Sequence, residues 1–286
     1  MADVITSRDN KWLKQFRAAL RGTGPRNGEP IGVEGPKLIE EALRSGLEAE
    51  ALLVSEGGER EAGRILKAAG ASDAGIPRSR VLRTTDKLFE GVAGTEAPQG
   101  VAALFRQREW EFDDVLRGPG EMRASSPLVI VLAAVQDPGN VGTILRSAEA
   151  FGATGAVASR GTADPWSPKA LRASAGSALR LPVLRGLAIP VVLAQLKMAK
   201  VKIYAASSAR ADRASGADLR EPAAIFVGNE SSGVPAEVKR AADAIISIPM
   251  AETVESLNAG VAASLVLYEA ARQRNAAAQG KPRNEA

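Results

Sequence analysis

One stretch in the middle of the chain constrains the fold more than any other. Residues 128–135 (LVIVLAAV) form a continuous apolar run of strand length, rich in β-branched side chains. Turn-forming Pro138 and Gly139 follow, and apolar side chains then recur at helical spacing over residues 140–151. A buried strand that leads through a tight turn into a helix is typical of open α/β sheets. We therefore expect an α/β fold in which this turn borders a ligand-binding crevice.

Three polar side chains gather at this turn without an obvious use in a core: Asp137, Asn140 and Arg146. Asn140 suits either the N-cap of the helix or a place in a binding site, and it is our candidate for the cap. Arg146 suits either a solvated helix position or a ligand contact. It does not share a helical stripe with Asn140, so the two converge only if Asn140 lies in the turn.

The composition limits the chemistry that the chain can perform. Its 286 residues include no Cys and no His, which excludes thiol nucleophiles, disulfides, imidazole bases and imidazole metal ligands. No apolar run reaches the roughly 18 residues of a membrane span, and the first residues lack the apolar core of a secretion signal. We therefore expect a cytoplasmic protein. Residues 127–286 carry 18 Lys and Arg against 13 Asp and Glu, which is compatible with a polyanionic partner.

The order of the expected elements indicates two domains. Alternating strand and helix patterns over residues 1–106 predict a small α/β sandwich. Residues 107–126 are charged, contain Gly and Pro and show no clear period, so we interpret them as a linker. A second α/β domain follows over residues 127–275, and the polar residues 276–286 predict a disordered tail.

The N-terminal helix that we expect over residues 8–20 is amphipathic. One face is apolar, and the opposite face carries four cations: Arg8, Lys11, Lys14 and Arg17. This pattern fits a docked helix with a solvated basic face. It also fits a helix that lays its cations on nucleic-acid phosphates.

Two later loops repeat the arrangement of a strand followed by polar residues. Gly228 and Glu230 follow the apolar run 223–227, and the glycine allows a close backbone approach or a positive φ. Ser256 and Asn258 follow the run 244–248; Ser256 suits the cap of the last helix and Asn258 its first turn. Taken separately, each loop is explained by residues that only begin a helix. If the sheet is parallel, all three loops meet at one crevice, which favours a binding site.

These loops lack the glycine pattern of a dinucleotide fold or a phosphate-binding loop. We therefore expect a ligand that is held largely by backbone groups rather than through a phosphate cradle. The final helix, predicted over residues 256–272, is apolar on nearly every side and should be buried. A subunit interface is one way to bury its outer face.

At these loops the sequence resembles the SpoU/TrmH family of RNA 2′-O-ribose methyltransferases, in the SPOUT superfamily. The resemblance rests on three ordered blocks: DPGNVGTILRSAEAFGA at 137–153, IFVGNESSGVP at 225–235 and ISIPMAETVESLNAGVAASLVLYE at 246–269. VEGPKLIEEAL at 33–43 is similar to part of the family's N-terminal RNA substrate-binding domain, a ribosomal-protein-like α/β sandwich. The resemblance implies a C-terminal SPOUT domain with a mostly parallel sheet and a trefoil knot.

The resemblance also implies S-adenosyl-L-methionine as cofactor, RNA (most often rRNA) as partner, a homodimer formed through the knot region, no metal and no membrane. The implied catalytic residues are Asn140, Arg146, Glu230, Ser256 and Asn258. The implied cofactor-binding residues are Ala205, Ala206, Gly228, Ile248 and Leu257. For RNA binding we expect Arg8, Lys11, Lys14, Arg17, Lys169 and Arg172.

A mechanism follows from this set of residues. We expect Arg146 to grip a substrate phosphate and polarise the ribose 2′-hydroxyl, Asn140 to fix Arg146 or the ribose, and Glu230 to orient Arg146 or a loop amide. A tRNA substrate, or a non-catalytic RNA-binding or ribosome-assembly factor with the same fold, remains as an alternative. The missing dinucleotide pattern disfavours an oxidoreductase.

Overall fold

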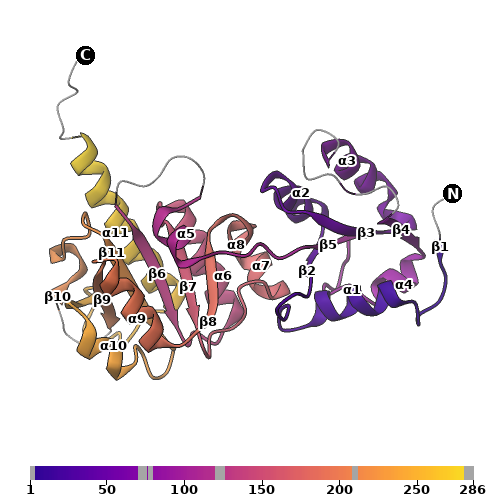
Figure 1. The fold of residues 1–286 in the computed structure, drawn as a ribbon. Coiled ribbons are helices and arrows are strands. Elements are labelled where there is room, and N and C mark those ends of the chain that lie inside the picture. Colours follow the sequence, from indigo (N-terminus) through magenta and orange to yellow (C-terminus); the bar gives the residue numbers. More distant parts are fainter. Residues whose placement is uncertain (1–3, 70–75, 77–79, 120–125, 208–211, 280–286) are drawn as a thin grey trace, which may run out of the picture. The chain divides into compact units, whose positions relative to one another are not determined.

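The computed structural model describes residues 4–69, 76, 80–119, 126–207 and 212–279. It divides into two compact units: unit 1 comprises residues 1–109 and 166–180, and unit 2 comprises residues 110–165 and 181–286. Figure 1 labels the helices and strands of both units.

Unit 1 is an α/β sandwich around a five-stranded mixed sheet of order β1-β4-β3-β5-β2. Its strands are β1 (Val4–Ile5), β2 (Ile31–Glu34), β3 (Ala49–Ser55), β4 (Val81–Thr84) and β5 (Val101–Phe105). Its helices are α1 (Lys11–Arg21), α2 (Pro36–Arg44), α3 (Glu59–Ala69), α4 (Asp86–Glu90), α7 (Pro168–Ser174) and α8 (Ser177–Arg180), with a 3-10 turn at η1 (Glu56–Gly58). The apolar faces of α1 and α4 pack on one side of the sheet, through Phe16, Leu20 and Phe89.

Unit 2 is built on a seven-stranded sheet of order β10-β12-β9-β11-β6-β7-β8, in which every neighbouring pair is parallel. Its strands are β6 (Leu128–Ala133), β7 (Gly155–Ser159), β8 (Val183–Leu187), β9 (Lys202–Ser207), β10 (Asp212–Arg213), β11 (Ala223–Gly228) and β12 (Ala244–Ser247). Its helices are α5 (Phe112–Arg117), α6 (Pro138–Ala150), α9 (Ile189–Met198), α10 (Ala236–Ala241) and α11 (Ala259–Gln279), with a 3-10 turn at η3 (Ala214–Gly216).

Helices cover both faces of this sheet, as expected of a parallel sheet. Val115 of α5, Val192 of α9 and Val238 of α10 share a core with alternate residues of β6, β9 and β11. Helices α6 and α11 pack together, and α6 lies against β7 and α11 against β11. The predicted α/β class and the mostly parallel sheet of the second domain are confirmed.

Several sequence-based expectations differ from the structure. The N-terminal helix, expected over residues 8–20, begins at Lys11, so Arg8 precedes it. Residues 112–117, assigned to the linker, form α5, whose Val115 is fully buried. Residues 166–180, assigned to the second domain, pack in unit 1, where Arg180 pairs with Glu41 at 2.7 Å. Residues 276–279, assigned to a disordered tail, continue α11; residues 280–286 lie outside the described part of the chain. Short-range sequence patterns therefore did not predict where tertiary packing extends a helix or places a segment in the other unit.

Candidate active site

The loops that carry chemistry meet at one edge of the unit 2 sheet. Strands β12, β9, β11 and β6 are consecutive and parallel, so their carboxyl ends lie side by side. The residues at or just after these ends supply the turn before α6, the loop 229–234 and the approach to α11. This is the edge at which open α/β sheets bind ligands.

The turn after β6 is fixed by Asp137 rather than by Asn140. Asp137 is the N-cap of α6, its carboxylate accepts the backbone N–H of Asn140 at 2.9 Å, and Pro138 occupies the first helical position. Our assignment of Asn140 as the cap is therefore wrong. Because Asp137 accepts the backbone N–H at the start of α6, the side chain of Asn140 is not needed as a cap and can make contacts outside the helix.

Asn140 is the middle member of a hydrogen-bonded chain that joins three loops. The Asn258 side chain donates to Asn140 Oδ1 at 2.9 Å, and Asn140 Nδ2 donates to Glu230 Oε1 at 2.8 Å. We name it the 258–140–230 chain; its two hydrogen-bonded pairs are 118 and 90 positions apart in the sequence. It brings together three of the five predicted catalytic residues.

The direction of this chain is set by α11. Asn258 Oδ1 accepts the N–H groups of Gly260 and Val261 at 2.9 and 3.3 Å, so Asn258, not Ser256, caps the helix. With its oxygen occupied, Asn258 can only donate toward Asn140. Asn140 must then present its oxygen to Asn258 and its amide hydrogens to Glu230.

Glu230 is held as an ionised acceptor. Burial raises the pKa of its carboxyl, but hydrogen bonds from the Asn140 side chain and from backbone amides, including that of Gln136 at 3.4 Å, together lower the pKa below its ordinary value. Protonation would disrupt these bonds, so Glu230 is a poor general base. Its carboxylate accepts the N–H of Gln136 in the loop before α6, and its role in orienting the site stays a prediction.

The loop after β11 depends on Gly228 and Asn229. A Cβ on Gly228 would lie 2.1 Å from the carbonyl carbon of Gly233, so only glycine fits beneath the returning loop. Asn229 Oδ1 accepts the N–H groups of Ser231 and Ser232 at 2.9 and 3.1 Å. The predicted close backbone approach at Gly228 is confirmed, and it fixes the loop that presents Glu230.

Ala134, between β6 and the turn, adopts a positive φ of 61°. Its N–H donates to Ser159 Oγ at 3.2 Å and Thr162 Oγ1 at 3.1 Å, and its carbonyl accepts Asn229 Nδ2 at 3.1 Å. These bonds hold a conformation that an L residue rarely adopts. The sequence analysis missed Ser159 and Thr162, since nothing in a local pattern indicates a partner about 25 residues away.

Arg146 and Ser256 lie outside the 258–140–230 chain. Arg146 is exposed on α6, and it makes no hydrogen bond or ion pair with any residue that the structure describes. Ser256 lies in the exposed segment 251–256 before α11. Arg146 is thus a cation without a partner among the described residues, available to a ligand.

The predicted cofactor residues lie near the same sheet edge. Ala205 is buried in β9 beside Phe226 of β11 and Ile245 of β12, and Ala206 follows it half-buried. Gly228 ends β11, while Ile248 and Leu257 are half-buried after β12 and before α11. Small and apolar residues beside strand-end backbone groups fit an adenosyl group that is bound mainly through the main chain.

The predicted RNA-binding cations differ in their surroundings within unit 1. Arg17 is half-buried and its Nε donates to the carbonyl of Gly91 at 3.1 Å, just past the end of α4. Lys14 pairs with Asp9 at 3.3 Å, and Lys11 lies over the Trp12 ring at 5.9 Å from its centroid. The three others are exposed: Arg8, Lys169 and Arg172. Arg17 therefore has a structural contact that the helical pattern alone did not reveal.

Among the residues that the structure describes, no group of three or more Asp or Glu side chains could hold a metal ion. No described helix is both long and apolar enough to cross a membrane.

This chain is similar to known proteins over most of its length. Residues 127–268 match the SpoU rRNA Methylase family, and residues 26–103 match the MRM3-like substrate binding domain. The 23S rRNA (guanosine(2553)-2′-O)-methyltransferase RlmP of Bacillus subtilis is 33% identical over 265 residues, which cover 92% of this chain and 97% of that protein.

Solved structures show the same fold over nearly the whole chain. The AdoMet-bound rRNA methyltransferase from Sinorhizobium meliloti is 29% identical with a TM-score of 0.79, covering 95% of this chain and 98% of that one. AviRb from Streptomyces viridochromogenes, a SpoU methyltransferase in complex with AdoMet, is 28% identical with a TM-score of 0.79, covering 93% and 98%.

Proposed function

Because this chain belongs to the SpoU rRNA methylase family, we propose that it transfers the methyl group of S-adenosylmethionine to a ribose 2′-hydroxyl in ribosomal RNA. The observation that carries the proposal is the 258–140–230 chain at the carboxyl edge of the parallel sheet. It joins all three sequence blocks that resemble the family. The bound AdoMet of two solved relatives supports the cofactor.

The residues present fit this cofactor, and cofactor binding and substrate binding fall to different residues. Gly228, Ile248 and Leu257, with Ala205 and Ala206 of β9, would hold S-adenosylmethionine at the strand ends. Its sulfonium supplies an already activated methyl group. The protein's main task is therefore to align the ribose hydroxyl with that methyl group, and alignment alone can contribute several kcal/mol.

Arg146 is the residue that meets the RNA. Its guanidinium is exposed and always charged, so it can grip a phosphate and polarise the 2′-hydroxyl. Asn140, held by Asn258 and Glu230, fixes the ribose beside it. Since Glu230 is engaged as an acceptor, the hydroxyl proton leaves to a substrate phosphate oxygen or to water. Ser256, exposed before α11, contacts the substrate from the third loop.

In this proposal the protein is a homodimer. Helix α11 exposes an apolar stripe of Val261, Leu265 and Tyr268, at 47, 44 and 53% exposure, although the sequence predicted a wholly buried helix. Tyr268 also stacks edge-on against Phe151 near the end of α6, with ring centroids 5.7 Å apart. These residues share one helical face, and a dimer through α6 and α11 would cover it.

We assign the trefoil knot to the same region. The chain leaves β12 near one side of the sheet, yet the next helix, α11, packs on α6, which follows β6, and β9 and β11 lie between β12 and β6. A return across the sheet of this kind supports a threaded C-terminus. We place the reaction in the cytoplasm, where a bacterial rRNA substrate is made.

The experiment is a methylation assay with matched RNA substrates. Purified protein and labelled S-adenosylmethionine are incubated with unmodified rRNA and, separately, with unmodified tRNA, and 2′-O-methyl positions are mapped. Methylation at one rRNA ribose is expected. Methylation of tRNA alone would overturn the rRNA assignment. Calorimetry that shows no binding of S-adenosylmethionine would favour a non-catalytic RNA-binding factor.

A further inference from the structure

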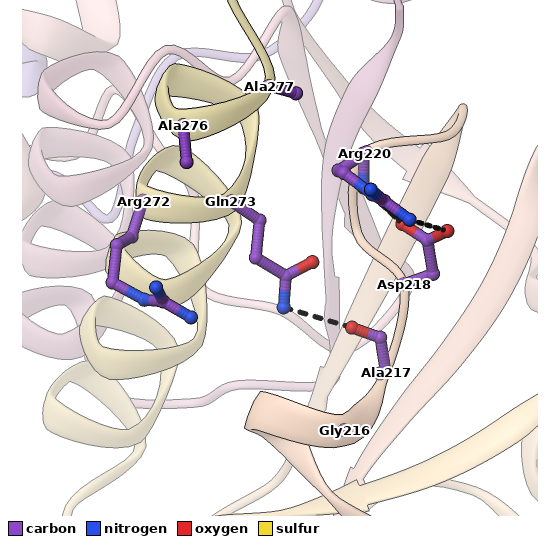
Figure 2. Close-up of a pocket in the computed structure, with 8 residues that line it drawn as sticks. All are labelled: Gly216, Ala217, Asp218, Arg220, Arg272, Gln273, Ala276 and Ala277. Atoms are coloured by element: carbon purple, nitrogen blue, oxygen red, sulfur yellow. Dashed lines mark hydrogen bonds and ion pairs between the residues drawn. The ribbon is translucent and has the colours of Figure 1, made fainter. Parts of the chain in front are cut away.

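The C-terminal half of α11 is fastened to the rest of unit 2 at the end of the sheet opposite the site. A hollow of about 490 Å³ separates α11 from residues 216–220, and the Gln273 side chain reaches across it to Ala217 (Figure 2). The two guanidinium groups that border the hollow are already paired, Arg220 with Asp218 and Arg272 with Glu269. The hollow therefore offers no free cation to a ligand, and its contacts point to a structural purpose.

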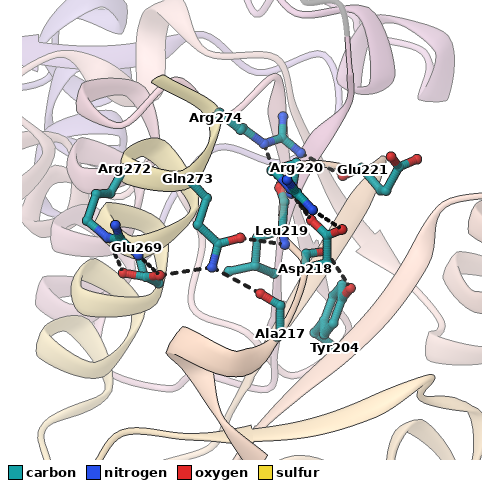
Figure 3. Close-up of polar contacts among 10 residues, drawn as sticks. All are labelled: Tyr204, Ala217, Asp218, Leu219, Arg220, Glu221, Glu269, Arg272, Gln273 and Arg274. Atoms are coloured by element: carbon teal, nitrogen blue, oxygen red, sulfur yellow. Dashed lines mark hydrogen bonds and ion pairs between the residues drawn. The ribbon is translucent and has the colours of Figure 1, made fainter. Parts of the chain in front are cut away.

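Gln273 and Arg274 make most of these contacts, and we name the pair the clasp. Gln273 Oε1 accepts the N–H of Leu219 at 2.9 Å, and Nε2 donates to the carbonyl of Ala217 at 3.0 Å (Figure 3). The side-chain amide thus pairs with the backbone much as a neighbouring strand would. It also receives support within α11, because Nε2 donates to Glu269 at 2.9 Å.

Arg274 is the stronger half of the clasp. Its guanidinium donates to four backbone carbonyls: Leu219 at 2.8 Å, Ser126 at 2.6 Å, Pro127 at 2.9 Å and Glu221 at 2.9 Å. Burial lowers the pKa of Arg274 below its ordinary value, which fits a cation that carbonyls rather than water solvate. The planar fork of arginine, with five N–H donors, bonds two separate chain segments at once.

The segments that the clasp holds lead into the strands of the active site. Ser126 and Pro127 precede β6, and Leu219 and Glu221 precede β11. The far ends of these same two strands carry the loops of Asn140 and Glu230. Helix α11 is thus tied to the beginnings of β6 and β11, while its own N-terminus brings Asn258 to their ends.

The clasp and the packing of α11 on α6 together set the axial position of α11. The segment before Asn258 cannot set it, because residues 251–256 are all exposed. Near its N-terminus, α11 presents small residues to α6: a Cβ on Gly260 would lie 3.1 Å from Thr143, and the hydroxyls of Ser264 and Ser147 lie 2.6 Å apart. Val266 and Leu267 are buried further along the helix, and the clasp adds directed hydrogen bonds at its C-terminal end.

We propose that Arg274, aided by Gln273, is a positioning residue for methyl transfer, which sets the 258–140–230 chain from the opposite end of α11. Asn258 lies about 24 Å away along the helix, at about 1.5 Å per residue. The proposal rests on the proposed function for its effect on catalysis, whereas its effect on the hydrogen-bonded chain does not depend on which substrate is methylated.

The first test observes the chain itself, without RNA. NMR of the full-length protein monitors the side-chain amide of Asn140, assigned by its loss in Asn140→Asp, and hydrogen exchange at Gly260 and Val261. Arg274→Lys should shift the Asn140 signal and speed the exchange about tenfold, as expected for loss of a few hydrogen bonds. The matched control is Arg117→Lys, which alters an exposed arginine that pairs with Asp113 inside α5 and does not touch the clasp, and it should change neither.

The second test asks whether Arg274 acts through Asn258. Methyl transfer to rRNA should fall in Arg274→Lys while the affinity for S-adenosylmethionine changes little. In a protein that already carries Asn258→Ala, Arg274→Lys should then cost nothing further, since residues in one network are non-additive. Rates that multiply in the double variant, or an unchanged Asn140 signal in Arg274→Lys, would overturn the proposal.

A milder variant covers the case in which Arg274→Lys does not fold. Gln273→Leu keeps all four bonds of Arg274 and removes those to Ala217 and Leu219. It should shift the Asn140 signal in the same direction by a smaller amount, and an unshifted signal would contradict the clasp. If the wild type methylates neither rRNA nor tRNA, the proposed function fails, and the NMR comparison still decides whether the clasp positions the chain.

Discussion

The substitution Gly228→Ala tests the architecture of the site most directly. The added Cβ would meet the carbonyl carbon of Gly233 at 2.1 Å, its oxygen at 2.2 Å and the nitrogen of Val234 at 2.2 Å. All three are backbone atoms, so no side chain can rotate away. Ordinary carbon contacts need about 3.5 Å, so the loop 229–234 must retreat by roughly 1.4 Å.

Two consequences follow from that displacement. Overpacking of this kind costs about 1–3 kcal/mol of unfolding free energy, which lowers the melting temperature of unit 2 by about 2–12 °C. The same loop carries Glu230, and a shift of about 1 Å at a site can cost about 100-fold in rate. We therefore expect methyl transfer to fall about 100-fold and the affinity for S-adenosylmethionine to fall as well.

The assays are thermal unfolding, calorimetry with S-adenosylmethionine and single-turnover methyl transfer. The control is Gly63→Ala, at an exposed position inside α3 where an added Cβ meets nothing within 4 Å. This change should stabilise unit 1 by about 0.5–1 kcal/mol and leave the affinity for the cofactor unchanged. If Gly228→Ala binds the cofactor and melts like the wild type, the backbone approach does not build the site.

Three further predictions concern the charged groups. Arg146→Ala should abolish turnover while calorimetry still detects binding of S-adenosylmethionine; loss of cofactor binding would contradict the assigned role. The lowered pKa of Glu230 means that its ionised form stabilises the fold above its unfolded pKa of about 4.3, and this contribution is lost as the pH falls through the lower folded value. Urea unfolding should therefore show a deficit for Glu230→Gln at pH 7 that shrinks below about pH 4, and a deficit that is constant with pH would be the wrong result. The logarithm of the affinity for rRNA should fall linearly with the logarithm of the salt concentration, and the slope should be smaller for Arg172→Ala. An affinity that does not change with salt would show that binding does not depend on phosphate contacts.

Much of this protein follows from local patterns. The run 128–135, the turn at Pro138 and the helix after it indicated a parallel α/β unit, because burial on both faces requires a continuous apolar strand. The close approach of the loop backbone to Gly228 was likewise predictable, since a glycine directly after a buried strand allows another backbone segment to pack against it. The resemblance of the three blocks named Asn140, Glu230 and Asn258 as site residues.

Local patterns did not predict the role of a side chain whose hydrogen-bond partner lies far along the sequence. Asp137 and Asn140 are both good caps by composition, and the choice between them rests on Glu230 and Asn258, which lie far along the chain. Helix α11 has an apolar sequence on nearly every side, yet its stripe at Val261 is exposed in one chain because α6 and the sheet cover only part of its surface.

The sequence alone determined most of the strands and helices, although not α5, because side-chain size, branching and spacing act over a few residues. It also determined the chemistry available, since a chain without Cys and His can use only oxygen groups, amides and cations. Only the tertiary structure decided which of those groups meet. The parallel order of β12, β9, β11 and β6 gathers three loops at one edge, and hydrogen bonds from the capped end of α11 give the resulting chain its direction. Direction depends on the geometry of donors and acceptors from distant segments, which a local pattern cannot contain.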